Sequence, residues 1–200
     1  MSGGDQHPNP LATPMDQLTG VYNRSAMLSL LFRETDRAQR MKTALCLLLF
    51  GIADCRQSCV HLDAKACDEL LCRAVNLVNR QLRSYDLLGR VEDEEFLAIL
   101  PGCSPMDAAL LAERLRMNVF AKPFLVAEES VQLCACFGIA SSEGRSPVVV
   151  LREAEQALQR AKETGPGTIL CFESGLDSTE PGHRTAGSSA VSVSATPRNS

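Results

Sequence analysis

The chain has 200 residues, of which 45% are apolar, and it carries a formal net charge of -4 at pH 7. This length allows one ordinary hydrophobic core, and the weakly acidic balance gives no general electrostatic attraction to nucleic acid or to an anionic membrane surface. No apolar stretch is long enough to cross a membrane, and the N-terminus lacks the basic-then-apolar pattern of a signal peptide. We therefore expect a cytoplasmic protein with no membrane span and no nucleic-acid partner.

The two ends of the chain differ in composition from its middle. Residues 1–13 are rich in Gly, Pro and Asn, and residues 175–200 are rich in Ser, Thr, Pro and Gly with little apolar periodicity. Segments of this kind cannot bury enough apolar surface to offset the entropy of ordering them. The sequence therefore predicts one domain at 14–174 between two disordered tails.

Within the predicted domain, apolar residues follow the helical period in some segments and the strand period in others. Asn23 is a candidate N-cap, and the continuous apolar run at 44–52 suits a strand that is covered on both faces. Strand-like residues at 86–89 and 96–100 flank a polar segment, which is typical of a hairpin with a charged tip. In chain order the predicted elements are a helix from Asn23 into the region 37–42, a strand at 44–52, a helix striped by Leu71, Val75, Val78 and Leu82, the hairpin, a helix opening at Pro105, a strand at 131–140, a helix striped by Leu151, Ala154, Leu158 and Ala161, and a strand at 168–172. This order predicts an α+β sandwich with a mixed sheet.

Five segments match the motifs of one protein family, and they occur in the family's order. They are D-Q-L-T-G-V-Y-N-R at 16–24, A-C-D-E-L-L at 66–71, R-S-Y-D-L-L-G-R-V-E-D-E-E-F at 83–96, C-F-G-I-A-S at 136–141 and A-E-Q-A-L-Q-R-A-K-E-T-G at 154–165. Together they resemble the GGDEF family, the diguanylate cyclases that join two GTP molecules into cyclic di-GMP. The resemblance implies a ferredoxin-like fold with a mixed central sheet and helices on both faces, similar to nucleotide cyclases and polymerase palms.

The strand before the hairpin has lost the acidic residues that the resemblance implies. Gly51 stands at the position of an Asp that holds a divalent metal in the family, and Ala53 stands at the position of a second Asp. The family's mechanism uses two metal ions, so the loss of a carboxylate here removes a hard oxygen ligand. A glycine within a strand has no packing benefit, and we therefore read Gly51 as a sign of lost metal binding.

The hairpin tip also departs from the family's pattern. Glu92 and Asp93 replace two glycines that let the backbone approach the nucleotide, and their carboxylates would repel its phosphates. Glu94 stands at a metal-binding position, and Glu95 stands at the acidic position that follows it. We interpret this run as a solvated acidic turn rather than a working metal site.

Recognition of GTP is altered as well. Cys59 replaces the guanine-reading Asn that the resemblance implies, whereas the guanine-reading Asp is kept as Asp68. Lys162 keeps the phosphate-contacting lysine of the family, but Pro166 replaces the basic residue that follows it. We expect an inactive enzyme without a cofactor; a residual cyclase that uses Glu94, Glu95 and an unrecognised ligand is the alternative.

A product-binding motif survives where the catalytic positions do not. The family's inhibitory site is R-x-x-D ahead of the signature, and here Arg83 and Asp86 occupy that register, while Arg90 matches a further basic residue. A guanidinium can donate to guanine O6 and N7 and can stack on a purine. A surface Arg–Asp pair without function is the competing interpretation.

These residues predict a receptor for cyclic di-GMP in bacterial signalling, whose bound state favours or disfavours an unidentified protein partner. The rival function is a nucleotide-independent protein-interaction scaffold that uses the acidic tip and the Ser-rich tail. The family's cyclases work as dimers, and a homodimer is compatible with either function.

The chain contains nine cysteines, an odd number, and a reducing compartment argues against a disulfide framework. A zinc or redox site deserves consideration because several candidate ligands lie close together in sequence. They are Cys55, Cys59, His61, Cys67 and Cys72. No C-x-x-C pair occurs, and Cys46, Cys134 and Cys136 fall in strand-like runs where a thiol behaves as a small apolar group. We therefore expect free thiols and no metal.

Overall fold

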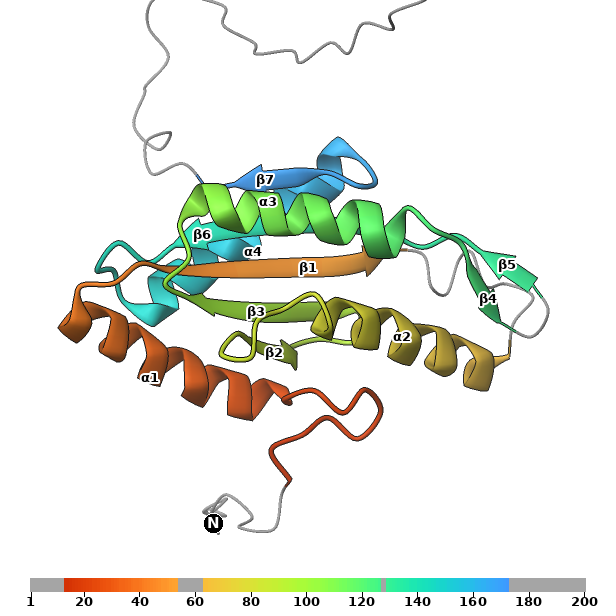
Figure 1. The fold of residues 1–200 in the computed structure, drawn as a ribbon, viewed down its shortest axis with the longest axis horizontal. Helices are drawn as coiled ribbons and strands as arrows, with labels where there is room; N and C mark the ends of the chain where they lie inside the picture. The colour runs from red at the N-terminus through yellow and green to blue at the C-terminus, as the bar shows by residue number, and fades with distance from the viewer. Residues whose placement is uncertain (1–12, 54–62, 127–128, 173–200) are drawn as a thin grey trace, which may run out of the picture.

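The computed structural model describes residues 13–53, 63–126 and 129–172. Apart from residue 13, the predicted tails lie outside these residues. A five-stranded sheet forms the centre of the molecule, with the strand order β2-β3-β1-β6-β7 (Figure 1). Its strands are β1 (Leu45–Ala53), β2 (Leu87–Arg90), β3 (Glu95–Pro101), β6 (Cys134–Ser141) and β7 (Ile169–Cys171). All neighbours are antiparallel except β6 and β7, which are parallel, so the predicted mixed sheet and α+β class are confirmed.

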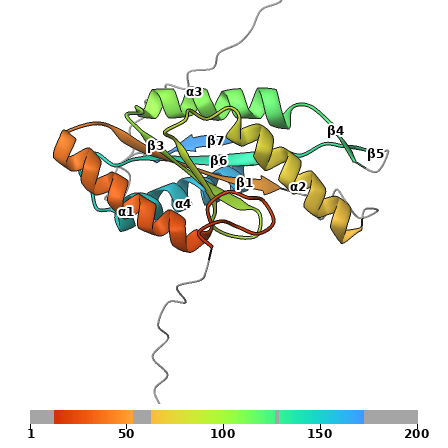
Figure 2. The ribbon, with the colours of Figure 1, turned by 60° about the horizontal axis from the view of Figure 1, so that its bottom comes forward.

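Helices cover both faces of this sheet. The helices α2 (Ala64–Asn79) and α3 (Pro105–Leu115) pack on one face, and α1 (Arg24–Met41) and α4 (Pro147–Thr164) pack on the other. Figure 2 shows α3 and α4 on opposite sides of the strands. Because side chains alternate along a strand, β1 sends Leu48 and Phe50 to the α2–α3 side and Leu47 and Leu49 to the α1–α4 side.

Aromatic stacking fixes the centre of the α2–α3 side. Phe50 on β1 lies opposite Phe96 on β3, and their stacked rings have centroids 5.5 Å apart. Phe120 and Phe137 complete the cluster, at 6.4 Å and 5.9 Å from Phe50. Rings at such distances stabilise a core beyond their buried area alone. Phe96, the last residue of the signature, therefore anchors the hairpin in the core.

On the other side, Gly138 sets the distance between β6 and α4. A Cβ atom at this position would lie 2.3 Å from the backbone nitrogen of Leu158 and 2.4 Å from the carbonyl oxygen of Ala154. Only a residue without a Cβ permits this approach. The contact brings the last turn of α4, which carries Lys162, next to Gly51 near the C-terminal end of β1.

The element prediction was correct in outline and wrong around residue 130. Asn23 caps α1 as predicted, because its side chain accepts a hydrogen bond from the backbone N–H of Ala26 at 2.9 Å. The predicted strand at 131–140 is broken: β5 (Glu129–Val131) pairs with β4 (Phe124–Val126) in a separate hairpin, and β6 starts at Cys134. At the break the Gln132 amide donates to the carbonyls of Phe120 and Leu133. The π-helical turn η1 (Arg116–Phe120) that follows α3 was not predicted either.

Candidate functional site

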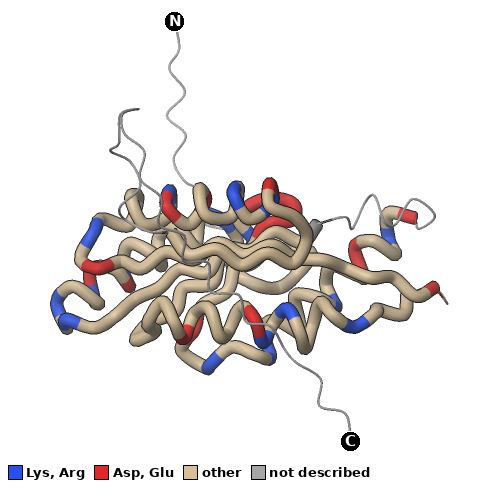
Figure 3. Tube along the Cα trace, turned by 90° about the horizontal axis from the view of Figure 1, so that it is seen from above, with Lys and Arg blue, Asp and Glu red and all other residues tan. Residues whose placement is uncertain are grey.

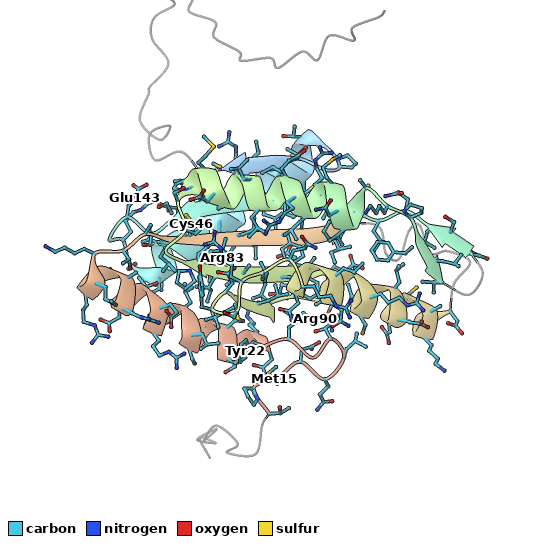
Figure 4. The ribbon with its side chains drawn as sticks, in the orientation of Figure 1. Met15, Tyr22, Cys46, Arg83, Arg90 and Glu143 are labelled. Carbon is cyan, nitrogen blue, oxygen red and sulfur yellow. The ribbon has the colours of Figure 1, made fainter. Side chains whose placement is uncertain are left out.

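An arginine links the hairpin to the entry loop at 16–24. Arg90, at the end of β2, donates from Nη1 to Asp16 at 3.3 Å and from Nε and Nη2 to the carbonyl of Asp93 at 3.0 and 2.6 Å. Burial alone would raise the pKa of Asp16, but hydrogen bonds from Thr19 and the nearby Arg90 outweigh it and hold that pKa below its usual value. In Figure 4, Arg90 lies above Tyr22 and Met15, in the segment that leads into α1. The donors of Arg90 therefore serve the loop and the tip, not the turn at Arg83.

The acidic tip is bound to cationic side chains of two helices. Glu92 forms an ion pair with Arg24 of α1, which also donates to the carbonyl of Val91 at 2.8 Å. Glu95 accepts from the ammonium of Lys162 at 2.6 Å, and these two side chains are 29% and 38% exposed. Figure 3 shows basic and acidic positions interspersed along the described chain. For Glu95 the prediction of a solvated turn was wrong, because α4 supplies a partner that lies distant in sequence.

The surroundings of Gly51, near the C-terminal end of β1, do not fit a divalent cation. Gly51 lies opposite Glu95 in the sheet and supplies no side-chain oxygen. A Cβ at Gly51 would lie 2.8 Å from Lys162 Cε and 3.2 Å from Nζ, so a cation already fills the space where a ligand carboxylate would begin. Within the described ranges, no three His, Cys, Asp or Glu side chains are placed to hold a metal ion. A groove of about 320 Å³ lies beside Glu95 and Lys162 and is also lined by residues of α4, namely Arg152, Gln156 and Gln159.

The turn at 83–86 joins α2 to β2. The backbone N–H of Arg83 donates to Asp86 Oδ2 at 2.8 Å, and the N–H of Asp86 donates back to the carbonyl of Arg83 at 3.1 Å. The exposed guanidinium lies over Tyr85, with its carbon 5.9 Å from the ring centroid and Nη1 3.1 Å from the hydroxyl. Among the described residues, no ion pair joins the side chains of Arg83 and Asp86. The Asp thus shapes the turn through the backbone, and most guanidinium donors face solvent.

Arg114 of α3 lies at the same turn, and sequence reasoning missed it. Its Nη2 donates to the carbonyl of Gln81 at 2.7 Å. Burial raises the pKa of the Asp86 carboxyl, and the charges of Arg83 and Arg114 offset part of that rise. Arg114 stands between the buried residues Leu111 and Leu115 of α3, and no local pattern indicates that this part of α3 lies beside the end of α2. Three charged side chains therefore converge where the motif supplied two.

The remaining predicted recognition residues are spread over other elements. Asp68 lies on the exposed face of α2, where burial together with its charge raises the pKa of Cys72. Cys59 lies outside the described residues. Pro166 is exposed in the turn that follows α4. The structure thus brings Lys162 and Glu95 together, whereas in the described chain no hydrogen bond or ion pair joins Asp68 to either of them.

The cysteines in the described ranges are free thiols. Burial, with a contribution from Cys103, raises the pKa of Cys46 to about 12, so its thiolate is inaccessible at neutral pH. Cys55, Cys59 and His61 of the zinc alternative lie outside the described residues. In the same described parts of the chain, the helices are too short or too polar to cross a membrane.

Comparison with known proteins agrees with this geometry. The family model "Diguanylate cyclase, GGDEF domain" matches residues 13–168. The chain is 30% identical to the response regulator PleD of Caulobacter vibrioides over 159 residues, and 32% identical to the diguanylate cyclase DgcP of Pseudomonas aeruginosa over 151 residues. These matches cover 78% and 75% of the chain but only 35% and 22% of the two relatives. The chain therefore spans about a third of the length of PleD and a smaller share of DgcP.

A solved structure shares the fold. The GGDEF domain of DgcB from Caulobacter crescentus, in complex with cyclic di-GMP, has a TM-score of 0.77 against this chain, with 22% sequence identity. The match covers 86% of this chain and all of that domain, 100% of its length. The motifs, the sheet order and the family match over most of the chain lead to one conclusion: the chain belongs to the GGDEF-domain family of diguanylate cyclases.

Proposed function

We propose that this chain is a catalytically inactive GGDEF-domain protein that serves as a cytoplasmic receptor for cyclic di-GMP in bacterial second-messenger signalling. The observation that carries the proposal is the turn at 83–86. Its backbone is held by Asp86, while the guanidinium of Arg83 faces solvent with most donors open. A guanidinium in this state can bind the Hoogsteen edge of guanine without first breaking an internal ion pair.

The charges around the turn suit a guanine-containing dianion. The positive charges of Arg83 and Arg114 both act on Asp86, and Asp86 can accept from the N–H groups of guanine. Tyr85, which is 55% exposed, offers a ring face beside Arg83. The DgcB domain, whose fold this chain shares, was solved with cyclic di-GMP. We therefore assign Arg83, Asp86 and Arg114 to the ligand; contact with Arg90 stays a prediction, since its donors already bind Asp16 and Asp93.

The proposed loss of activity is supported by the surroundings of Gly51 on β1. Gly51 offers no oxygen ligand, and Lys162, the lysine that the family would use on phosphate, donates to Glu95 at 2.6 Å. Catalysis by two metal ions needs carboxylates at this place. We expect purified protein with GTP and Mg²⁺ or Mn²⁺ to yield no cyclic di-GMP above a no-enzyme control, and product formation would establish the residual cyclase instead.

Calorimetric titration tests the receptor function directly. Cyclic di-GMP is titrated into protein stripped of copurified nucleotide, and into Arg83→Ala and Arg80→Ala. Arg80 is an exposed arginine three positions away at the end of α2, so its variant matches the charge change. We expect Arg83→Ala to weaken binding by about tenfold or more and Arg80→Ala to leave it unchanged. Equal affinities in all three proteins would move the site elsewhere.

The scaffold is the second candidate function, and one observation favours it. Met106, Leu110 and Met117 form an exposed apolar stripe along α3 and η1, at 70%, 61% and 50% exposure. An apolar surface of this kind is used in protein contacts. If cyclic di-GMP gives neither heat nor a thermal shift, the scaffold becomes the better account.

A further inference from the structure

The hydroxyl of Tyr85 holds one end of the Arg83 guanidinium. Arg83 and Asp86 are the first and last residues of a turn, which is closed by the hydrogen bond from the N–H of Asp86 to the carbonyl of Arg83, and Tyr85 lies within it. Arg83 Nη1 donates to the Tyr85 hydroxyl at 3.1 Å, and the guanidinium carbon lies 5.9 Å from the ring centroid. Within the described chain, Nε and Nη2 of Arg83 form no hydrogen bond. The tyrosine therefore engages one nitrogen of the guanidinium and leaves the other two open.

The two open nitrogens form the edge of an arginine that recognises paired acceptors. A guanidinium is planar, and its Nε and Nη2 hydrogens form a fork that fits two neighbouring acceptor atoms. Arg116 of this chain uses the same two nitrogens to bind both carboxylate oxygens of Glu113, at 2.7 and 2.6 Å. Guanine presents a matching pair of acceptors, O6 and N7, on its Hoogsteen edge. With Nη1 engaged by Tyr85, the fork of Arg83 is the edge that remains for a base.

We propose that Tyr85 is a positioning residue for Arg83, whose hydroxyl directs the Nε–Nη2 edge of the guanidinium toward O6 and N7 of a guanine of cyclic di-GMP. This inference rests on the proposed receptor function and deepens it, because it adds a residue that lies between Arg83 and Asp86 to the reading of the base. Tyr85 also lines a groove of about 330 Å³ beside the turn, so a ligand can approach it without displacing a core side chain.

The advantage of this arrangement is preorganisation. An exposed arginine has many rotamers, and restricting them during binding lowers affinity by about two- to tenfold. The hydrogen bond and the ring of Tyr85 restrict Arg83 before the ligand arrives. Phenylalanine at position 85 keeps the ring and removes only the hydroxyl, so this substitution isolates the contribution of the hydrogen bond.

Calorimetry with two ligands tests the positioning role. Cyclic di-GMP and its 7-deaza analogue, whose guanines lack the N7 acceptor, are titrated into wild type, Tyr85→Phe, Tyr22→Phe and Arg83→Ala. The chain has two tyrosines, and in the described chain the hydroxyl of Tyr22 forms no hydrogen bond, so Tyr22→Phe is the matched control. We expect Tyr85→Phe to bind cyclic di-GMP about fivefold more weakly than wild type, and Tyr22→Phe to bind it as wild type does.

The analogue distinguishes positioning from a general effect on the turn. Loss of N7 removes one of the two acceptors, so wild type should bind the analogue about tenfold more weakly than cyclic di-GMP. In Tyr85→Phe this difference should shrink to about twofold, because a guanidinium that rotates freely no longer donates to both atoms at once. A substitution that only loosened the turn would weaken binding of both ligands by the same factor.

The possible results separate this inference from the receptor function. If wild type does not bind cyclic di-GMP, the receptor function fails and the inference fails with it. If wild type binds and Arg83→Ala does not, the receptor function stands. The positioning role is then overturned by any of three results: Tyr85→Phe has the affinity of wild type, its N7 difference stays at the wild-type value, or Tyr22→Phe loses as much affinity.

Discussion

The two ends of β2 use charge in opposite ways. Before the strand, Arg83 and Asp86 lie in one turn but form no ion pair with each other in the described chain, and the guanidinium faces solvent. After the strand, Glu92 and Glu95 pair with Arg24 and Lys162 from two helices. Charged groups that remain open can exchange water for a ligand, whereas groups already paired must first lose that partner. The difference separates charged groups that are open to solvent from charged groups that are part of the fold.

The largest expected effect comes from Gly138→Ala, which should disrupt the paired charges after β2 and leave the turn at 83–86 intact. The new methyl would collide with the backbone of α4 at 2.3 to 2.8 Å, so the helix must move and carry Lys162 away from Glu95. We expect a loss of about 3 kcal/mol in the free energy of unfolding, measured by urea denaturation. Affinity for cyclic di-GMP in protein that stays folded should hold, because α4 packs on the face of the sheet opposite α2 and α3, beside which the turn at Arg83 lies. A variant as stable as wild type would show that α4 does not rest on Gly138.

An intermediate effect is expected for Arg114→Met, which tests the charges at the turn at 83–86. Removal of this charge leaves Asp86 with less compensation for its burial, so the pKa of Asp86 should rise further. We expect affinity for cyclic di-GMP to fall by about tenfold, with little change in stability. Titration calorimetry gives the affinity, and NMR titration of the carboxyl carbon gives the pKa. Unchanged values of both would remove Arg114 from the site.

The smallest effect is expected for Arg90→Met, which separates a structural role from ligand contact. Arg90 and Asp16 are largely buried, with 18% and 21% of their side chains exposed, so loss of the pair should cost about 1 kcal/mol of stability. The pKa of Asp16 is lowered from 3.8, and this contributes stability above pH 3.8 that is lost as pH falls through the lower folded value. The stability difference between wild type and Arg90→Met should therefore narrow in acid. If cyclic di-GMP affinity falls as far as in Arg83→Ala, Arg90 belongs to the ligand site after all.

The sequence was sufficient for features that depend on local pattern. The cap at Asn23, the buried strand of β1 and the stripe of α4 follow from side-chain periodicity and hydrogen bonding between neighbours in the chain. The hairpin was also predicted, since strand-like residues flank a polar tip. These elements are determined by interactions over a few residues, so a single sequence contains the necessary information.

Features that depend on tertiary packing were not predicted. Gln132 ends a strand-like run because its amide reaches Phe120, twelve positions earlier. The partner of Glu95 comes from position 162, and the charge beside Asp86 comes from position 114. Nothing local in the hairpin indicates which helix will lie beside it. The sequence alone could therefore list charged residues but could not sort the paired from the open ones.

The glycine at position 51 also constrains how this chain could change in future. A single substitution to Asp would meet the ammonium of Lys162, and a single loss of Lys162 would strip Glu95 of its counter-charge without supplying a new oxygen. The residue at one of these positions therefore determines the effect of a substitution at the other, which is epistasis between residues in contact.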